Sequence, residues 1–413
     1  MLISKNMHVN RIPIYIKIAC FLNFLIFISF FTINYTSYGS LVMMGLGVCS
    51  VFVMALSDGK KIRLRWNKYY SFMLTFIVFS FLSCIWAIDP SDPIGKSITL
   101  LKCLLIVFMM MIAYERLSDV SVFLITILVA GYGVVIYSIF TYGLSTMRAV
   151  LLDSSRLDST FANVNTVGML AALSVVITIY LLLNKKIEWY CLIPTALCIY
   201  VIAATSSRKA LVALILGVIL VFLFYKDSND MGKKISRLAI TTIVVFLIYL
   251  ILSRVSIFNG IMERMDGLIN MFFGSGYIDR SARGRNTMIE LGIEQFYKTP
   301  ILGIGMGGGH QINYKEAYLH NNFIEVLVGG GLVGFCLYYS MYVYLLVSYM
   351  KYWKWRDDYS RVCVILLVLL LMLDYGCVSY AEKHTFFFQA LLFMNVSHMK
   401  RRYIDGVNYH EYS

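Results

Sequence analysis

Residues 318–335 read YLHNNFIEVLVGGGLVGF and place a histidine and two asparagines directly in front of a long apolar run. The run extends to about residue 349, and a helix needs only about 20 residues to cross the roughly 30 Å hydrocarbon core of a membrane. Glycines in such a run let a neighbouring helix pack closely; they are Gly329, Gly330, Gly331 and Gly334. The stretch therefore predicts a membrane span that begins beside His320, Asn321 and Asn322.

The composition extends this prediction to the whole chain. Of the 413 residues, 59% are hydrophobic and 14% are charged. We expect an all-α, polytopic integral membrane protein with about twelve transmembrane helices, arranged as a single transmembrane domain over residues 1–413. The predicted spans lie near residues 14–33, 39–57, 69–88, 94–113, 120–141, 163–183, 189–204, 207–225, 238–256, 319–349, 362–376 and 385–398.

The basic residues predict the orientation, because positively charged loops stay in the cytoplasm. Lys and Arg concentrate in alternate connections, such as 60–68 and 351–361, so we expect both termini in the cytoplasm. The first apolar run lacks a cleavage site of small residues and predicts a retained span. This topology accounts for most of the net charge of +13, and no basic patch with interleaved aromatic residues predicts a nucleic-acid partner.

The nine cysteines lie within or beside apolar runs and show no spacing typical of zinc ligands. We interpret them as small apolar side chains. The sequence predicts no cofactor, no metal site and no disulfide framework.

One connection is long, at residues 254–318 on the predicted outer face, and loops of this length usually carry function or their own structure. Its apolar spacing predicts a helix near 257–272 that lies along the membrane surface. A second helix is predicted from Arg285 to a stop at Pro300. The glycine-rich run at 301–310 lacks the Gly-Lys-Ser/Thr ending of a nucleotide site, and we interpret it as a flexible hinge.

Polar residues gather at the predicted outer ends of the spans. Arg208 lies between two closely spaced apolar runs, where an ionisable group is costly unless it faces a cavity or a partner. A guanidinium suits pyrophosphate because it offers a planar fork of donors; solvation or pairing with membrane lipids is the alternative for each arginine alone. The polar set is Arg156, Asn163, Asn165, Arg208, Lys209, Arg283, Arg285, His320, Asn321 and Asn322.

His320 is the candidate general base, since a neutral imidazole can accept the proton of an attacking hydroxyl. The adjacent amides would fix its tautomer; a bond to headgroups or water is the alternative. His310 and His384 also lie on the predicted outer face, without comparable neighbours. Asp89 and Asp92 lie beside two prolines and are typical of turn residues, so we do not expect a carboxylate pair of glycosidase type.

Four segments between residues 150 and 340 resemble the O-antigen polymerase and ligase superfamily. HNNFIEVLVGGGLVG resembles its motif of His-Asn, nine residues and Gly-x-x-Gly, and TSSRKAL resembles Ser-x-Ser-Arg. GRNTMIELGIEQFYKTPILGIGMG is similar to its segment of Gly-Arg, helix and Pro-Leu-x-Gly-x-Gly. RLDSTFANVNTVGML resembles Gly-x-Phe-x-Asn-Pro-Asn through Phe161, Asn163 and Asn165, although Val164 replaces the proline. In the Gly-Arg segment, Ile289 stands where tryptophan is common.

The resemblance implies a GT-C-type, metal-independent glycosyltransferase of the bacterial inner membrane whose donor is a glycan on undecaprenyl pyrophosphate. A sugar hydroxyl attacks the anomeric carbon and the lipid pyrophosphate leaves, so a periplasmic site needs cations and a base. We predict His320, Arg285 and Arg208 as catalytic residues. The predicted substrate-binding residues are Arg156, Asn163, Asn165, Lys209, Arg283, Asn321 and Asn322.

The acceptor separates the two activities of this superfamily. A polymerase extends another lipid-linked repeat unit, whereas a ligase transfers the glycan to lipid A core. We favour an O-antigen polymerase because the short run from Pro300 to His320 leaves little loop for recognising a core oligosaccharide. A ligase is the first alternative, and a transporter of lipid-linked glycan or another anion is the second. The sugars, the linkage, the choice between O-antigen and capsule, and a chain-length regulator protein as partner stay open.

Overall fold

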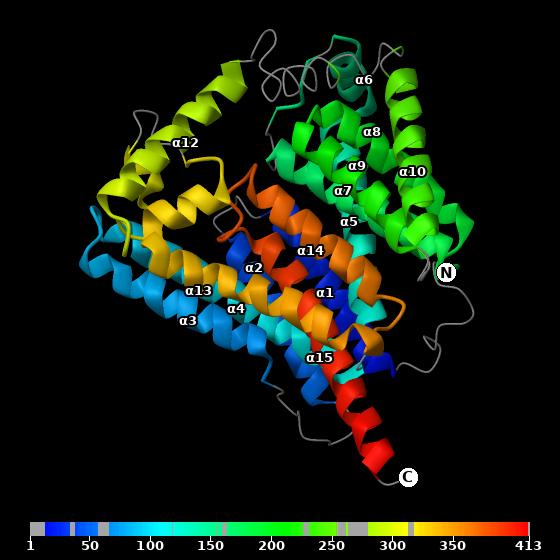
Figure 1. Ribbon diagram of the computed structural model, residues 1–413, viewed down its shortest axis with the longest axis horizontal. Coiled ribbons are helices and arrows are strands. Elements are labelled where there is room, and N and C mark those ends of the chain that lie inside the picture. Colours follow the sequence, from blue (N-terminus) through cyan, green and yellow to red (C-terminus); the bar gives the residue numbers. More distant parts are fainter. Residues whose placement is uncertain are drawn as a thin grey trace. The chain divides into compact units, whose positions relative to one another are not determined.

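A computed structural model shows a helical protein, and the part of the chain that it describes contains no β-strand (Figure 1). The described residues are 13–33, 38–56, 66–117, 119–153, 155–158, 163–225, 231–252, 254, 262, 280–312 and 318–411. The helix predicted near 257–272 and the motif residue Phe161 therefore lie outside the described residues, apart from Met262.

A helix lies in each of the predicted apolar stretches. Six helices are long and apolar enough to cross a membrane: α1 (Ile14–Thr32), α3 (Lys68–Leu82, extended to Ile85 by a 3₁₀ turn), α4 (Ser91–Leu117), α5 (Val120–Tyr142), α7 (Val164–Leu183) and α13 (Asn322–Tyr352). The shorter apolar helices are α2 (Gly39–Ala55) and α8 (Leu192–Thr205). The others are α6 (Leu144–Leu152), α9 (Arg208–Phe224), α10 (Met231–Leu252), α12 (Arg280–Lys298), α14 (Ser360–Asp374) and α15 (Lys383–Glu411). The polytopic helical class is confirmed, and a total of about twelve crossings stays a prediction.

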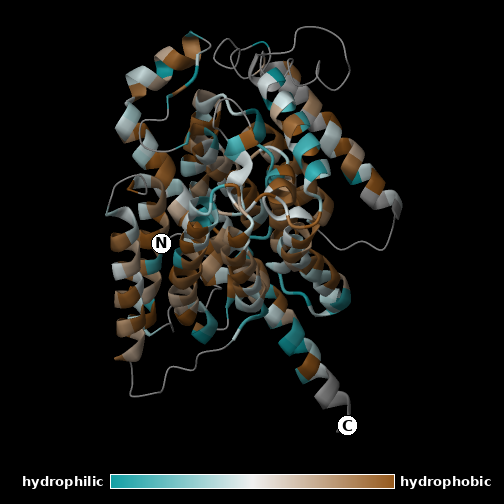
Figure 2. Ribbon diagram, turned by 90° about the vertical axis from the view of Figure 1, so that its left-hand side faces the viewer, coloured by the Kyte–Doolittle hydropathy of each residue, from teal (hydrophilic) through white to brown (hydrophobic). Residues whose placement is uncertain are grey.

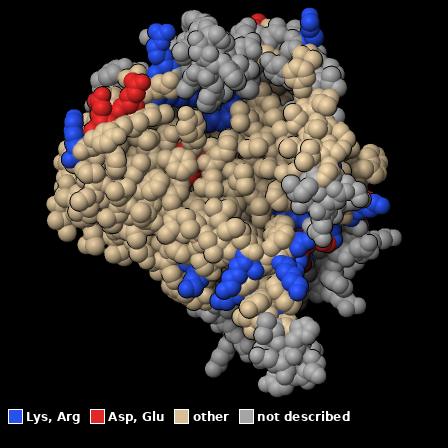
Figure 3. All heavy atoms as spheres, viewed as in Figure 1, with Lys and Arg blue, Asp and Glu red and all other residues tan. Residues whose placement is uncertain are grey.

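The hydropathy of the helices fits a membrane environment. Figure 2 shows hydrophobic residues along most helices and hydrophilic residues at the C-terminal end of α15. Val343, Val347 and Met350 of α13 are exposed apolar side chains, as expected where a helix faces lipid. Over the lengths of α3 and α13 the surface in Figure 3 is free of charged side chains, and Lys and Arg gather near one end of these helices.

The chain forms two compact units. Unit 1 comprises Met1–Leu46 and Leu124–Asp279, and unit 2 comprises Gly47–Phe123 and Arg280–Ser413. In unit 1, α7 packs against both α8 and α9 (Figure 1). Gly168 of α7 permits this approach, because a Cβ added there would lie 2.7 Å from Thr205 Oγ1 and 3.3 Å from Ser207 Cβ. The α8–α9 turn is therefore held close to the start of α7.

In unit 2, α13 packs against α3 and α12. Gly330 and Gly334 face Phe79 of α3, and a Cβ at Gly334 would lie 2.7 Å from that ring. This confirms close helix packing at two of the four glycines. The other two behave differently, because α13 is broken at Gly331, whose φ of 58° and ψ of −161° are not helical.

The break in α13 is filled by the glycine-rich run that follows α12. Ile304 N–H donates to Val328 C=O at 2.9 Å, and Gly305 N–H donates to Gly329 C=O at 3.0 Å. In return, Leu332 N–H donates to Pro300 C=O at 2.8 Å, and Val333 N–H donates to Ile301 C=O at 3.1 Å. Backbone groups that a broken helix leaves unpaired must find partners away from water, and the two segments supply them to each other.

Residues 300–307, called the plug below, are therefore fixed by their backbone bonds to α13 and are buried from Gly303 onward. The prediction of a flexible hinge was wrong. Gly303, Gly305 and Gly307 have φ values of 67°, 100° and 91°, which only glycine adopts readily. A Cβ at Gly303 would lie 2.5 Å from Val328 O. Trp86 Nε1 also donates to Leu302 C=O at 3.1 Å, which ties the plug to the end of α3.

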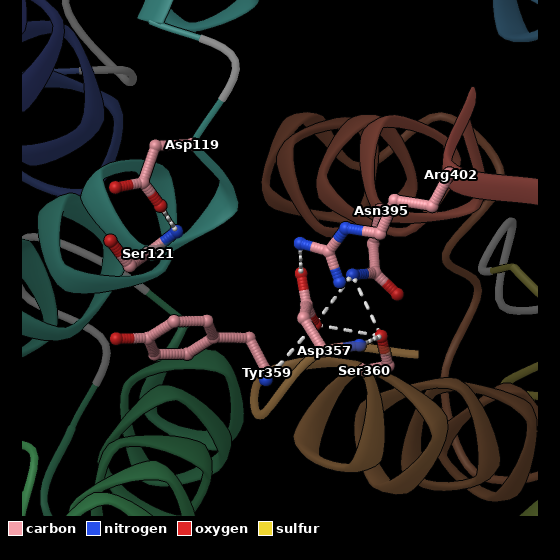
Figure 4. A network of polar contacts seen from close by, with 7 residues as sticks. All are labelled: Asp119, Ser121, Asp357, Tyr359, Ser360, Asn395 and Arg402. Carbon is pink, nitrogen blue, oxygen red and sulfur yellow. Dashed lines mark hydrogen bonds and ion pairs between the residues drawn. The ribbon is translucent and has the colours of Figure 1, made fainter. Parts of the chain in front are cut away.

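A polar network lies between the N-terminus of α14 and residues 395–402 of α15 (Figure 4). Asp357 accepts hydrogen bonds from Ser360 Oγ at 2.7 Å and Asn395 Nδ2 at 3.3 Å, and it pairs with Arg402 at 3.3 Å. Burial raises the pKa of neighbouring Tyr359 to about 12, so its hydroxyl stays protonated at neutral pH. These side chains cap α14 and tie it to α15, and we interpret the network as structural.

Candidate active site

The arginine turn, residues 205–208, connects α8 to α9. Ser206 adopts the left-handed backbone conformation with φ 45° and ψ 36°, which is uncommon for a residue other than glycine. Ser207 is the N-cap of α9, and Arg208 begins that helix with only 7% of its surface exposed. A buried cation at the positive end of a helix makes a place where an anion would be attracted by both the guanidinium and the helix.

Arg156 joins the arginine turn from a separate segment. Its Nε donates to Thr205 C=O at 3.2 Å, and a terminal nitrogen donates to Asn165 Oδ1 at 2.7 Å. Ser207 Oγ donates to the same Asn165 oxygen at 3.3 Å. The structure thus brings Arg156 and Asn165 to the turn that carries Arg208, although Thr205 is 49 residues after Arg156 and Ser207 is 42 residues after Asn165.

Two other predicted residues of this group lie close by. Asn163 is the N-cap of α7, and its side chain accepts the backbone N–H of Asn165 at 3.0 Å. Lys209 follows Arg208 on α9 and is half-buried. Asn163 therefore has a local structural role that fixes the start of α7 and, with it, the amide of Asn165.

The histidine turn, residues 318–321, precedes α13 in unit 2. His320 is half-buried and has a φ of 59°, so it too is left-handed. Its ring lies 4.3 Å from the ring of Tyr318, centroid to centroid. Asn321 is the N-cap of α13 and accepts the N–H of Ile324 at 3.1 Å. The predicted base therefore stands in a turn fixed by the helix that follows it.

Every hydrogen-bonding group of the Asn322 side chain has a partner within the protein. Its amide nitrogen donates to Tyr339 OH at 2.8 Å and to Asp374 at 3.2 Å, and its oxygen accepts the N–H groups of Ser379 and Tyr380, each at 2.9 Å. These four bonds fill the capacity of the amide, and the side chain is fully buried. The structure gives Asn322 the role of fixing the α14–α15 connection to α13, which leaves no free group for the predicted substrate contact.

Arg283 and Arg285 lie in the first turns of α12, where Arg283 is exposed and Arg285 is half-buried. Met288 is three residues after Arg285 and so lies on the same side of the helix. It packs in a buried cluster with Leu319, the residue before His320. The side of α12 that carries Arg285 is thus the side that packs against the histidine turn.

Sequence reasoning missed a second polar group at this end of unit 2. Asp92 lies 3.6 Å from His310 Nε2 and accepts a hydrogen bond from Gln311, whereas His310 Nδ1 is 3.0 Å from Gly307 C=O. We interpreted Asp92 only as a turn residue and His310 as lacking neighbours, and both interpretations need this correction. Nothing in the sequence signals the contact, because it depends on how the plug packs beside α4.

Asp89 does behave as a turn residue. It accepts the N–H of Ser91 at 2.8 Å, and hydrogen bonds from the Ser91 backbone and side chain lower the pKa of the Asp89 carboxyl. A carboxyl that ionises more readily is poorly suited to act as a general acid.

The comparison with known proteins agrees with the positions of these turns. No curated protein matches the chain. Residues 193–339 match the family model described as O-antigen ligase. This range holds the arginine turn, Arg285 and the histidine turn; Arg156, Asn163 and Asn165 precede it. Residues 193–339 are therefore similar to the O-antigen ligase family, which supports the resemblance to the O-antigen polymerase and ligase superfamily.

Proposed function

We propose that this protein is an O-antigen polymerase, which joins oligosaccharide repeat units carried on undecaprenyl pyrophosphate by metal-independent glycosyl transfer. The family already indicates a multi-pass membrane enzyme of the glycosyltransferase kind that acts on lipid-linked glycans. The observation that carries the proposal is the arginine turn, where Arg156, Asn165 and a buried Arg208 meet at the N-termini of α7 and α9.

In this scheme the arginine turn binds the leaving group. The acceptor hydroxyl forms a bond to the anomeric carbon, and the bond from that carbon to the pyrophosphate oxygen breaks with its electron pair moving to the oxygen. Arg208 and Arg156, with Lys209, stabilise the charge that develops there. Side chains supply all of the positive charge in this scheme, so it uses no metal ion.

His320 takes the proton from the acceptor hydroxyl. The half-buried imidazole sits at the entrance to α13, and Tyr318 limits the positions of its ring. Arg285 lies on the side of α12 that packs over this turn and completes the cation set, with the exposed Arg283 near the donor glycan. Asn321 and Asn322 hold the turn and leave substrate binding to their neighbours.

The arginine turn is in unit 1 and the histidine turn is in unit 2, and the proposal gives each turn its own role in the transfer. Both would face the periplasm. The distribution of Lys and Arg supports this orientation, with both termini in the cytoplasm and the protein in the bacterial inner membrane.

The plug favours a polymerase over a ligase. Between Pro300 and His320, residues 301–305 fill the break in α13 and residues 308–312 form a 3₁₀ turn, which commits most of this connection to packing. Little remains to recognise a lipid A core. The description of the matched family as O-antigen ligase favours the second candidate, a ligase that uses the same donor site.

The broken α13 also bears on the transporter alternative, since transporters often use broken helices to bind ions. Here the plug already hydrogen bonds to the backbone groups that the break frees. The backbone groups of Val328, Gly329, Leu332 and Val333 are therefore already paired with the plug, and glycosyl transfer remains the favoured function.

A gel of surface glycan from a strain that lacks this gene tests the proposal. Core that carries a single repeat unit is expected, with long chains restored by the wild-type gene and not by Arg208→Ala. Bare core, with polymer accumulating on the lipid carrier, would identify the protein as the ligase. An unchanged ladder would refute both activities. Polymer formed by the purified protein from lipid-linked repeat units would exclude transport alone.

A further inference from the structure

The backbone of the histidine turn needs an external support. His320 holds a left-handed conformation at φ 59°, which costs about 1–3 kcal/mol for most residues other than glycine, although histidine tolerates it better than most. Such a conformation persists only when its surroundings fix it. The N-cap bond of Asn321 fixes the residue after His320. The residue before His320, Leu319, needs a support of its own.

The residue before His320 is held by Glu325. The backbone N–H of Leu319 donates to Glu325 Oε2 at 2.9 Å, and the Leu319 side chain is fully buried with Met288, Ile304 and Val328. A carboxylate is a stronger acceptor of such a bond than a neutral group. Glu325 lies in the first turn of α13, where an acidic side chain is favoured by the helix dipole.

Glu325 also contacts the turn that follows the plug. The carboxylate is only 4% exposed, and a Cβ added at Gly309 would lie 2.7 Å from Oε1. Lys96 of α4 and His310 are near enough to interact with Glu325 electrostatically, so the buried carboxylate has both hydrogen-bond and charge partners. Gly309 is thus a position where an added methyl group would displace the carboxylate without removing it.

We infer that Glu325 is a positioning residue for His320: its carboxylate ties the histidine turn to the first turn of α13 and to Gly309, and so sets where the imidazole meets the acceptor. This inference rests on the proposed role of His320. Because Glu325 bonds to the backbone of the turn, its effect on the reaction is exerted through His320.

The test combines Glu325→Ala, Glu325→Gln and Gly309→Ala with Glu290→Gln as a control, because Glu290 is an exposed carboxylate of α12. Each purified protein is assayed for glycosyl transfer over a range of pH and acceptor concentrations. The rate at which diethyl pyrocarbonate modifies His320 is followed by mass spectrometry, which needs no turnover.

Glu325→Ala is expected to lower transfer by about 10- to 100-fold, the scale of a misplacement near 1 Å, and to change the modification rate of His320. Glu325→Gln keeps an acceptor for Leu319 N–H, so it should restore most of both. Gly309→Ala should resemble Glu325→Ala in the wild-type background and add little in the Glu325→Ala background. The control should match wild type. If Glu325→Ala does not fold, Gly309→Ala and Glu325→Gln carry the same test.

Two failures are distinguishable. An unchanged His320 modification rate in both Glu325→Ala and Gly309→Ala would overturn the positioning role whatever the activity. Additive losses of Gly309→Ala and Glu325→Ala would overturn it too. Normal transfer by His320→Ala would instead overturn the proposed role of His320, while the modification rates would still decide whether Glu325 fixes the turn.

Discussion

The arginine turn and the histidine turn each contain a left-handed residue, but different kinds of contact hold them in place. Each places one residue other than glycine, Ser206 or His320, in a left-handed conformation just before a helix N-terminus. The arginine turn is held by polar side chains, since Arg156 donates to Thr205 C=O, and Asn165 accepts from both Arg156 and Ser207. The histidine turn is fixed by the Glu325 carboxylate, which accepts the N–H of Leu319, by the N-cap bond of Asn321, and by the buried side chain of Leu319.

This difference fits two kinds of task. Polar side chains can exchange partners with an arriving anion, so the arginine turn can reorganise around a pyrophosphate. The histidine turn is held by Glu325, and its Leu319 is buried against Ile304 of the plug and Val328 of α13, so a change of partners there would disturb buried packing. We therefore expect the first turn to bind and the second to orient, and the following substitutions test that division.

The largest effect is expected from His320→Ala. Removing a general base typically lowers a rate by about 10²–10⁴-fold, whereas donor binding should stay unchanged because the arginines remain. Single-turnover transfer and binding of a lipid-pyrophosphate analogue separate the two quantities. A variant with transfer within two-fold of wild type would show that the histidine turn is not catalytic.

Gly303→Ala should have the next largest effect, because it should destabilise the plug that supports the histidine turn. A Cβ there would lie 2.5 Å from Val328 O in a residue with φ of 67°, and strain of this kind costs roughly 2–4 kcal/mol. Thermal unfolding in detergent measures the loss. Gly95→Ala is the matched control, since nothing lies within 4 Å of a Cβ at Gly95. Equal stability of the two variants would contradict a fixed plug.

Arg208→Lys keeps the charge and removes the planar fork of donors. We expect the donor analogue to bind about 10- to 100-fold more weakly, with acceptor affinity unchanged. The control is Arg148→Lys on α6, where the arginine is exposed. If both variants bind the analogue equally well, the buried arginine does not hold pyrophosphate.

Asn165→Ala should give the smallest of these effects. It removes the oxygen that accepts from Arg156 and Ser207, and a bond to a charged group is worth about 1.5–3 kcal/mol net. Because Arg156 keeps its bond to Thr205 C=O and Arg208 is untouched, we expect only part of this, roughly a 5- to 30-fold loss in donor binding. Asn184→Ala at the opposite end of α7 should leave binding unchanged. A larger loss than that of Arg208→Lys would mean that Asn165 touches the donor itself.

The sequence predicted most of the helices, since apolar runs define them. The predicted helix in the long loop that begins at Arg285 and stops before Pro300 is present as α12. The plug was misread because glycine at 303, 305 and 307 signals both flexibility and a fixed positive φ, and only the partner segment decides between them. The hydrogen bonds of Asn322 could not be predicted for a similar reason, as its four partners come from distant parts of the chain.

By itself the sequence determined that the chain is a helical membrane protein with arginines and a histidine at the ends of its spans, because hydropathy and charge act locally. Only the tertiary structure decided that α13 breaks at Gly331 around the plug, that Asn165 joins Arg156 to the arginine turn, and that Glu325 supports the histidine turn. Each of these contacts links segments through buried backbone or side-chain groups. Which buried groups meet depends on packing, which local composition does not encode.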